Sequence, residues 1–220
     1  MKNPFPYSDS NKRYYTYDYY LRRTYVHKCR RIPLDGGFTC PNRDGTRGIG
    51  GCAFCSSKGS GDFTASCTKT IAEQYAEINK NISSKWDENS MNIPYFQAYT
   101  NTYAPLEVLR EKYEQALTVI PNIAELCIAT RADCLADDTL TYLENVTKHT
   151  PVMLELGLQT IHDTTSTLMN RGHTVICRVT GDGAPDELVA PNWSRKKFIV
   201  MNTIDKLMVT RDTWQGKKYN

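Results

Sequence analysis

The sequence predicts an α/β fold in which parallel strands alternate with helices. Four apolar runs have the length of buried strands, at residues 93–100, 125–130, 152–158 and 175–180. The segments between the first three runs carry apolar residues at the three- and four-residue spacing of amphipathic helices. Strands separated by helices of this length are typical of βα units, so we expect a parallel sheet, either open or closed into a barrel.

Each predicted helix follows a residue that suits a helix start. Thr70 and Glu73 have the spacing of a capping box, and aspartate, serine and proline are favoured at or next to the first turn. A short helix is also predicted at about residues 163–170. In chain order, the predicted starts of the longer helices are Thr70, Pro105, Asp137 and Ser194.

The composition predicts a globular protein of the cytoplasm. The 220 residues are 40% hydrophobic and 23% charged, which is enough to bury a core. The N-terminus has no apolar leader and no run approaches the length of a membrane span, so we expect no membrane contact. In a reducing compartment, the eight cysteines are expected to be metal ligands or catalytic thiols rather than disulfides.

The N-terminal segment, residues 1–27, is basic and rich in tyrosine. Residues 12–31 contain seven Lys or Arg, six Tyr and a single acid, Asp18. Bases stack on aromatic rings and phosphates pair with Arg and Lys, which makes tRNA or another RNA a candidate partner. The alternative is that Tyr17 and Tyr20 anchor an amphipathic helix while the basic side chains face water. The net charge of +3 does not decide between the two.

Three cysteines in the stretch CPNRDGTRGIGGCAFC predict a metal centre with an open coordination position. Cys40, Cys52 and Cys55 lie in a glycine-rich loop, here called the cysteine loop (residues 40–55), which is supple enough to wrap around a bulky centre. Thiolates suit iron–sulfur clusters and zinc. Three of them leave one position of the centre for a small molecule. The alternative is a structural zinc, with candidate fourth ligands Cys29, Cys67 and His27.

The cysteine loop and its flanks resemble a known family. The stretches PLDGGFTCPNRDGT and GGCAFC are similar to the cluster loop of the YhcC-type proteins of the radical S-adenosylmethionine (SAM) superfamily. Those proteins are relatives of the elongator-type and oxygen-independent coproporphyrinogen oxidase enzymes. The resemblance continues, in order, through YFQAYTNTYAPLEVL, TRADCL, ELGLQTIHD, NRGH, TGDGAPDELVAPNWS and DTWQGKKY.

The resemblance implies a partial parallel (β/α) radical SAM barrel with two cofactors. Cys40, Cys52 and Cys55 would hold a 4Fe–4S cluster, and SAM would chelate its open iron through the methionyl amine and carboxylate. An electron from a donor such as flavodoxin or ferredoxin would cleave SAM reductively, giving methionine and a 5′-deoxyadenosyl radical that acts on an unidentified substrate. The alternative function is a non-catalytic module that binds zinc or a cluster, and RNA.

The resemblance also implies which other residues meet SAM. Phe54 matches the aromatic position near the adenine, and Gln97 and Asn101 lie in the loop after the second strand, which contacts the methionyl amine. Gln159 and Arg171 match a glutamine and an arginine that touch the ribose and the carboxylate. An amide satisfies ribose hydroxyls and a guanidinium pairs with a carboxylate, so the assignment is chemically sound.

Glu155 is expected to point into the same cavity. It alternates with Gly157 and Gln159 along one strand, so the three residues share a face. The alternative is that Glu155 forms an internal ion pair with Arg131 that braces the barrel.

The chain departs from the family pattern at one point. After His173, the family continues through further βα units before the segment similar to VICRVTGDG, whereas here Thr174 joins the two parts. We therefore expect a basic segment at 1–27, an incomplete radical SAM core at 28–174 and a strand–loop–helix segment at 175–220. The barrel should be open on one side, SAM binding weakened, and cluster assembly retained while turnover is impaired.

Overall fold

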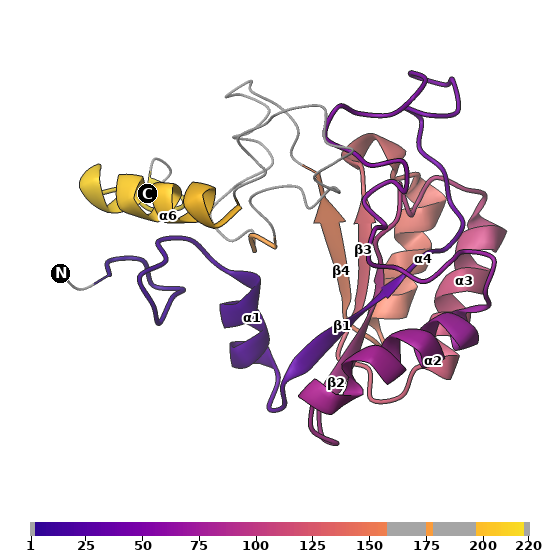
Figure 1. The fold of residues 1–220 in the computed structure, drawn as a ribbon, viewed down its shortest axis with the longest axis horizontal. Coiled ribbons are helices and arrows are strands. Elements are labelled where there is room, and N and C mark those ends of the chain that lie inside the picture. Colours follow the sequence, from indigo (N-terminus) through magenta and orange to yellow (C-terminus); the bar gives the residue numbers. More distant parts are fainter. Residues whose placement is uncertain (1–2, 158–174, 178–196, 218–220) are drawn as a thin grey trace. The chain divides into compact units, whose positions relative to one another are not determined.

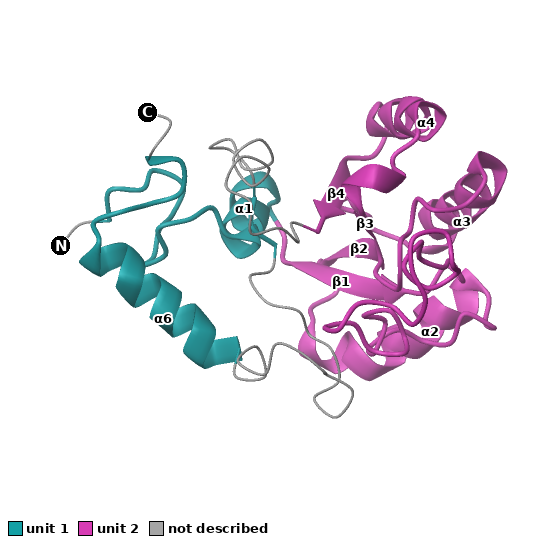
Figure 2. Ribbon diagram, turned by 90° about the horizontal axis from the view of Figure 1, so that it is seen from above, with its two compact units in different colours: residues 1–26, 158–181, 191–220 teal, residues 27–157, 182–190 magenta. Residues whose placement is uncertain are grey.

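The computed structural model of this chain describes residues 3–157, 175–177 and 197–217. The chain divides into two compact units, and each is described by itself (Figure 2). The larger unit comprises residues 27–157 and 182–190, and the smaller unit comprises the rest. No helix within the described ranges is long and apolar enough to cross a membrane. The predicted short helix, Ser194, Gln159 and Arg171 lie outside the described residues.

Four parallel strands form one sheet in the larger unit, in the order β1-β2-β3-β4 (Figure 1). Neighbouring strands pair in parallel, with Cys29 opposite Met91 and Leu126 opposite Val152. The predicted α/β class with a parallel sheet is confirmed. The strands are β1 Cys29–Leu34, β2 Met91–Phe96, β3 Leu126–Thr130 and β4 Val152–Leu156.

The strands differ from the prediction at several points. β4 ends at Leu156 rather than at residue 158, and the described part of the predicted run 175–180, residues 175–177, forms only an isolated bridge between Ile176 and Thr16. β2 ends at Phe96 rather than at residue 100, because Tyr99 has a φ of 62°, which a strand cannot continue. β1 is not located by the hydrophobic pattern, because Arg30, Arg31 and Pro33 interrupt its apolar residues. Its place in the sheet is fixed by pairing with β2 along its whole length.

Three helices of the larger unit cover one face of the sheet (Figure 1). The capping box predicted for the first is confirmed, because the Thr70 hydroxyl accepts from the Glu73 backbone and the Glu73 carboxylate accepts from the Thr70 backbone. The predicted cap at Asp137 is wrong. Ala136 is the N-cap, and Asp137 lies in the first turn, where its charge suits the helix dipole. The helices are α2 Ile71–Ile82, α3 Leu106–Val119 and α4 Asp137–Thr147, and 3-10 turns occur at Ser83–Lys85 and Ala132–Cys134.

The core of the larger unit lies between the sheet and these helices. Phe96 of β2 and Tyr113 of α3 meet in it with ring centroids 5.0 Å apart in a T-shaped arrangement. Because side chains alternate along a strand, the members of this core define the helix-facing side of the sheet. Other members are Ile32, Leu34, Leu109, Leu126, Ile128 and Leu143.

The opposite face of the sheet carries an ion pair. Arg31 Nη1 of β1 lies 3.5 Å from Glu155 Oε2 of β4, and the Arg31 guanidinium lies 4.3 Å from the centroid of the Tyr95 ring. Two strands separate β1 from β4, which would put them about 14 Å apart in a flat sheet. The contact is compatible with a sheet that curves toward this face, as in a partial β/α barrel.

The last strand of the sheet is less covered than the others. Every residue of β4 is half-buried or exposed, whereas all residues of β2 except the first are buried. This is the burial expected of a strand at the edge of a sheet.

The smaller unit joins the N-terminal segment to the C-terminal helix. Its helices are α1 Tyr17–Thr24 and α6 Lys197–Thr210, and α6 confirms the predicted last helix. Lys12 forms an ion pair with Asp205, and Arg13 Nη1 lies 2.9 Å from Asp212 Oδ1. Arg13 is also buried, so these contacts hold the two ends of the chain in one unit.

Candidate metal centre

The cysteine loop lies at the carboxyl ends of the strands, where ligands bind in parallel βα folds (Figure 1). It belongs to the long connection, residues 35–70, between β1 and α2. Several hydrogen bonds hold this connection to the segment after β2. The Gln97 Nε2 donates to the Ser60 oxygen at 2.7 Å, the Tyr99 backbone N to the Gly59 oxygen at 2.7 Å, and the Thr100 backbone N to the Thr39 oxygen at 3.2 Å.

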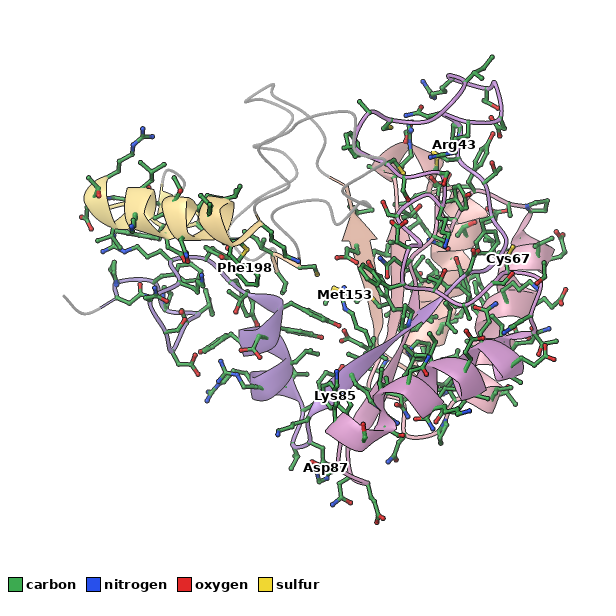
Figure 3. All side chains as sticks on the ribbon, in the orientation of Figure 1. Arg43, Cys67, Lys85, Asp87, Met153 and Phe198 are labelled. Atoms are coloured by element: carbon green, nitrogen blue, oxygen red, sulfur yellow. The ribbon has the colours of Figure 1, made fainter. Side chains whose placement is uncertain are left out.

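Arg43 clamps the two arms of the connection together. Its Nη2 donates to the Ser56 oxygen and its Nη1 to the Ser57 oxygen at 3.4 Å. The guanidinium also lies 5.4 Å from the centroid of the Tyr99 ring. Figure 3 shows Arg43 at the end of the sheet opposite to Lys85 and Asp87. One side chain thus ties the segment after Cys55 to the turn that follows Cys40.

Each of the three predicted ligand thiols is free, half-buried and faced by a hydrogen-bonding group. The Asn42 Nδ2 donates to Cys52 Sγ at 3.0 Å, and Ser60 Oγ lies 3.8 Å from Cys55 Sγ. The Arg131 guanidinium is a hydrogen-bond partner of Cys40. The pKa of Arg131 is raised chiefly by Asp133 and, to a smaller extent, by this contact with Cys40. Hydrogen-bonding groups beside ligand sulfurs are part of the surroundings that a metal centre requires.

The loop after β3 also takes part in the site through Arg131 and Asp133. The guanidinium and the carboxylate form two hydrogen bonds of 2.9 and 2.8 Å. The hydrogen bonds from Arg131 are the main reason that the pKa of Asp133 is lowered to about 2, so the carboxylate is charged at neutral pH. Arg47 of the cysteine loop lies 3.5 Å from the same carboxylate. The cysteine loop is therefore braced against both neighbouring strand ends.

Zinc and a 4Fe–4S cluster require different spacings of the three thiols. No group of three His, Cys, Asp or Glu side chains among the described residues is placed to hold a metal ion. Thiolates around one zinc lie about 3.8 Å apart, because Zn–S bonds are about 2.3 Å long and tetrahedral. Two candidate fourth ligands, His27 and Cys29, precede or begin β1, about 20 Å along the strand from the loop. A 4Fe–4S cluster places four irons and four sulfides between its thiols, so those thiols need not touch.

Gln97 and Asn101 form part of the structural frame of the site. The Gln97 amide holds the Ser60 oxygen, and the Asn101 Nδ2 donates to the Ala129 oxygen at 2.8 Å. Asn101 is fully buried, and its backbone oxygen accepts from the Tyr113 hydroxyl. Its Oδ1 is buried and accepts no hydrogen bond from the described residues, so this acceptor is the part of Asn101 that a ligand could use.

The remaining predicted site residues are not brought together in the described ranges. Phe54 is half-buried between Cys52 and Cys55. Glu155 lies on the face of the sheet opposite the helices, where its partner is Arg31, while Arg131 pairs with Asp133. The Glu155–Arg131 pair considered from the sequence is therefore replaced by two separate pairs.

The residues around the sulfurs are not identified by the sequence pattern. Asn42, Arg43 and Ser60 lie in or beside the cysteine loop, but their spacing relative to the cysteines has no standard meaning. Arg131 is suggested by the sequence only as a partner of Glu155. One general expectation could have pointed to them: half-buried thiols need hydrogen-bond donors nearby, and polar residues that flank the motif are the nearest source.

Comparison with known proteins finds relatives along most of the chain. The sequence is 49% identical to YtqA, an uncharacterized protein of Bacillus subtilis (strain 168), over 181 residues, which are 82% of this chain and 56% of YtqA. It is 45% identical to the protein YhcC of Escherichia coli (strain K12) over 158 residues, which are 71% of this chain and 49% of YhcC. It is 32% identical to MJ0486, an uncharacterized protein of Methanocaldococcus jannaschii, over 161 residues, which are 72% of this chain and 48% of that protein.

These matches cover only part of each relative. The chain spans about half the length of the curated relatives it matches. No family model matches the sequence, and no solved structure matches it. The chain is a homologue of the YhcC-type proteins.

Proposed function

We propose that this chain binds a 4Fe–4S cluster through Cys40, Cys52 and Cys55 and presents the open iron to SAM. One observation carries the proposal: three free thiols lie on one loop at the carboxyl edge of a parallel sheet, and each is faced by a hydrogen-bonding group. When bound, the cluster would supply the electron that cleaves SAM to methionine and a 5′-deoxyadenosyl radical.

The protein's own residues would prepare the site for an anionic cluster. Asn42, Ser60 and Arg131 would stabilise the negative charge of a bound cluster, because hydrogen-bond donors and a cation beside the ligand sulfurs offset that charge. Arg43 and Gln97 hold the loop in place through the oxygens of Ser56 and Ser60. These contacts restrict the thiols before the cluster binds and so lower the entropic cost of binding.

The SAM-binding residues of the proposal rest on the resemblance. Phe54 would lie against the adenine, and Asn101 would offer its Oδ1 to the methionyl amine. Gln159 and Arg171, outside the described residues, would bind the ribose and the carboxylate. Flavodoxin or ferredoxin is the class of electron donor that the proposal requires.

The test is anaerobic SAM cleavage by the reconstituted chain. With dithionite as reductant and SAM present, we expect 5′-deoxyadenosine at a rate well below that of full-length YtqA, because the family's further βα units are not found after His173. The Cys52→Ala variant should form none, and Cys29→Ala should match the parent chain. No 5′-deoxyadenosine from a chain that carries its cluster would reject SAM cleavage. A rate equal to that of YtqA would reject the impairment.

RNA is the weaker proposal for a substrate. Four of the seven basic residues in the segment 12–31 already form ion pairs: Lys12 with Asp205, Arg13 with Asp212, Arg22 with Asp9 and Asp18, and Arg31 with Glu155. Phosphate binding would compete with these pairs. Retention on immobilised tRNA that is lost at moderate salt would support RNA, and no retention at low salt would remove it.

A further inference from the structure

Asn42 links the two arms of the cysteine loop through both its side chain and its backbone. Its Nδ2 lies 3.0 Å from Cys52 Sγ and donates a hydrogen bond to it. Its backbone oxygen accepts from the Gly51 backbone N at 2.9 Å. One half-buried residue near the start of the loop therefore holds two consecutive residues at its end.

The chemistry of this hydrogen bond suits a ligand sulfur. The amide nitrogen of asparagine can only donate, and a thiolate accepts more strongly than a neutral thiol because it carries a full charge. The amide also brings no charge of its own, unlike Arg131 beside Cys40. At 3.0 Å it is closer to its sulfur than Ser60 Oγ is to Cys55 Sγ at 3.8 Å.

We infer that Asn42 is a positioning residue that orients the Cys52 thiolate and raises the reduction potential of the bound cluster, an inference that rests on the proposed function. Reduction adds a negative charge to the cluster and its sulfurs. An N–H donor stabilises the more negative state more strongly, and hydrogen bonds to sulfur are among the factors that set iron–sulfur potentials. The substitution of Asn42 should therefore make the cluster harder to reduce.

Two substitutions separate the hydrogen bond from the volume of the side chain. Asn42→Leu keeps a similar volume and removes the donor, whereas Asn42→Ala removes both. Thr46→Ala is the matched control: its hydroxyl lies in the same loop, 3.0 Å from the Tyr103 hydroxyl, so the variant loses a neutral hydrogen bond away from the sulfurs. All three substitutions leave the backbone contact of Asn42 with Gly51 available.

The readout is the ratio of reduced to oxidised cluster, followed by electron paramagnetic resonance at a fixed solution potential that half-reduces the parent protein. We expect both Asn42 variants to show a roughly tenfold lower ratio, equal to about 59 mV for one electron. Thr46→Ala should stay within about twofold of the parent, since its contact is remote from sulfur. Equal ratios in all four proteins would overturn the inference and leave the proposed function intact.

Loss of the cluster from the variants is also decisive. If Asn42→Leu and Asn42→Ala hold no iron while Thr46→Ala does, Asn42→Gln becomes the test, because it retains an amide donor. Iron binding restored by Asn42→Gln supports the inference, and iron still absent from that variant overturns it. A parent chain without iron would instead reject the proposed function itself.

Discussion

Gly51→Ala tests whether the conformation of the cysteine loop depends on the Arg43 clamp. Gly51 has a φ of 89°, in a region that L-residues rarely adopt. A Cβ at this position would lie 2.8 Å from Arg43 Nη2, closer than Cβ atoms approach other heavy atoms. The substitution therefore imposes both backbone strain and displacement of the guanidinium.

The magnitude follows from these two effects. Backbone strain in this region costs about 1–3 kcal/mol. Displaced Arg43 loses its hydrogen bonds to the Ser56 and Ser57 oxygens, which costs about 1.5 kcal/mol for a partly exposed charged donor. Alanine reduces the entropy of the unfolded chain, which offsets about 0.4–1 kcal/mol. The net loss of loop stability is about 2–4 kcal/mol.

Two neighbouring glycines provide matched controls. Gly50 has a φ of 84°, but an alanine Cβ there would meet no atom within 4 Å, so Gly50→Ala carries strain without a clash and should cost about 1–2 kcal/mol. Gly48 is outside the positive-φ range, and its Cβ would meet the Asn42 oxygen at an ordinary 3.7 Å. Gly48→Ala should therefore change stability by less than about 0.5 kcal/mol.

The assay combines urea unfolding with the rate of tryptic cleavage after Arg47 and Lys58, which reports local opening of the loop. Both should rank the variants in the order Gly51→Ala, Gly50→Ala, Gly48→Ala, from most to least destabilised. If the loss of free energy exceeds the free energy that keeps the loop closed, the loop opens locally. Cleavage then becomes faster without a matching decrease in the midpoint of urea unfolding. Equal behaviour of Gly51→Ala and Gly48→Ala would refute the reasoning.

Three further predictions concern the larger unit. Burial, and secondarily a nearby glutamate, raise the pKa of Cys29 from 9.0 to about 11. Its alkylation rate at pH 8, measured by peptide mass spectrometry, should therefore be about 100-fold lower than that of a peptide thiol and should keep rising with pH toward pH 11. A rate that stops rising near pH 9 would contradict this prediction. Thr70→Ala breaks the capping box of α2 and should lower the free energy of unfolding by about 1 kcal/mol, more than twice the effect of Thr68→Ala on the preceding exposed loop. Tyr113→Phe removes a buried hydroxyl that donates a hydrogen bond and should lower the free energy of unfolding in urea by about 1–2 kcal/mol. Tyr142→Phe removes a buried hydroxyl that has no hydrogen-bond partner in the described residues and should not lower it. Equal losses of stability in the two variants would show that hydrogen bonding is not the cause.

The elements that are predicted correctly are those whose signal is local. The α2 start depends on Thr70 and Glu73, three residues apart, and both hydrogen bonds of the capping box form. β3 is a short apolar run and is buried as such a run should be. β1 escapes prediction because Arg31 faces the side of the sheet away from the helices, where Glu155 and Tyr95 accommodate its charge. That environment is created by other strands and leaves no mark on the local pattern.

In the candidate site, the cysteines have a local sequence signal, whereas the groups around them do not. The spacing of Cys40, Cys52 and Cys55 predicts a thiol site from a single stretch of sequence. The groups that face these thiols depend on the path of the loop and on the next strand end, as Asn42 and Arg131 show. Sequence likewise could not show that the Gln97 amide holds the chain's own Ser60 oxygen, because an amide at a strand end suits a ligand equally well.

The central claim is most directly tested by counting iron and acid-labile sulfide after anaerobic reconstitution. We predict about four of each per chain, with broad visible absorption from thiolate-to-iron charge transfer. Single Cys40→Ala, Cys52→Ala and Cys55→Ala variants should lose them, while Cys29→Ala and Cys67→Ala keep them. A colourless chain that binds stoichiometric zinc without sulfide, or equal iron content in Cys52→Ala and Cys29→Ala, would contradict the account.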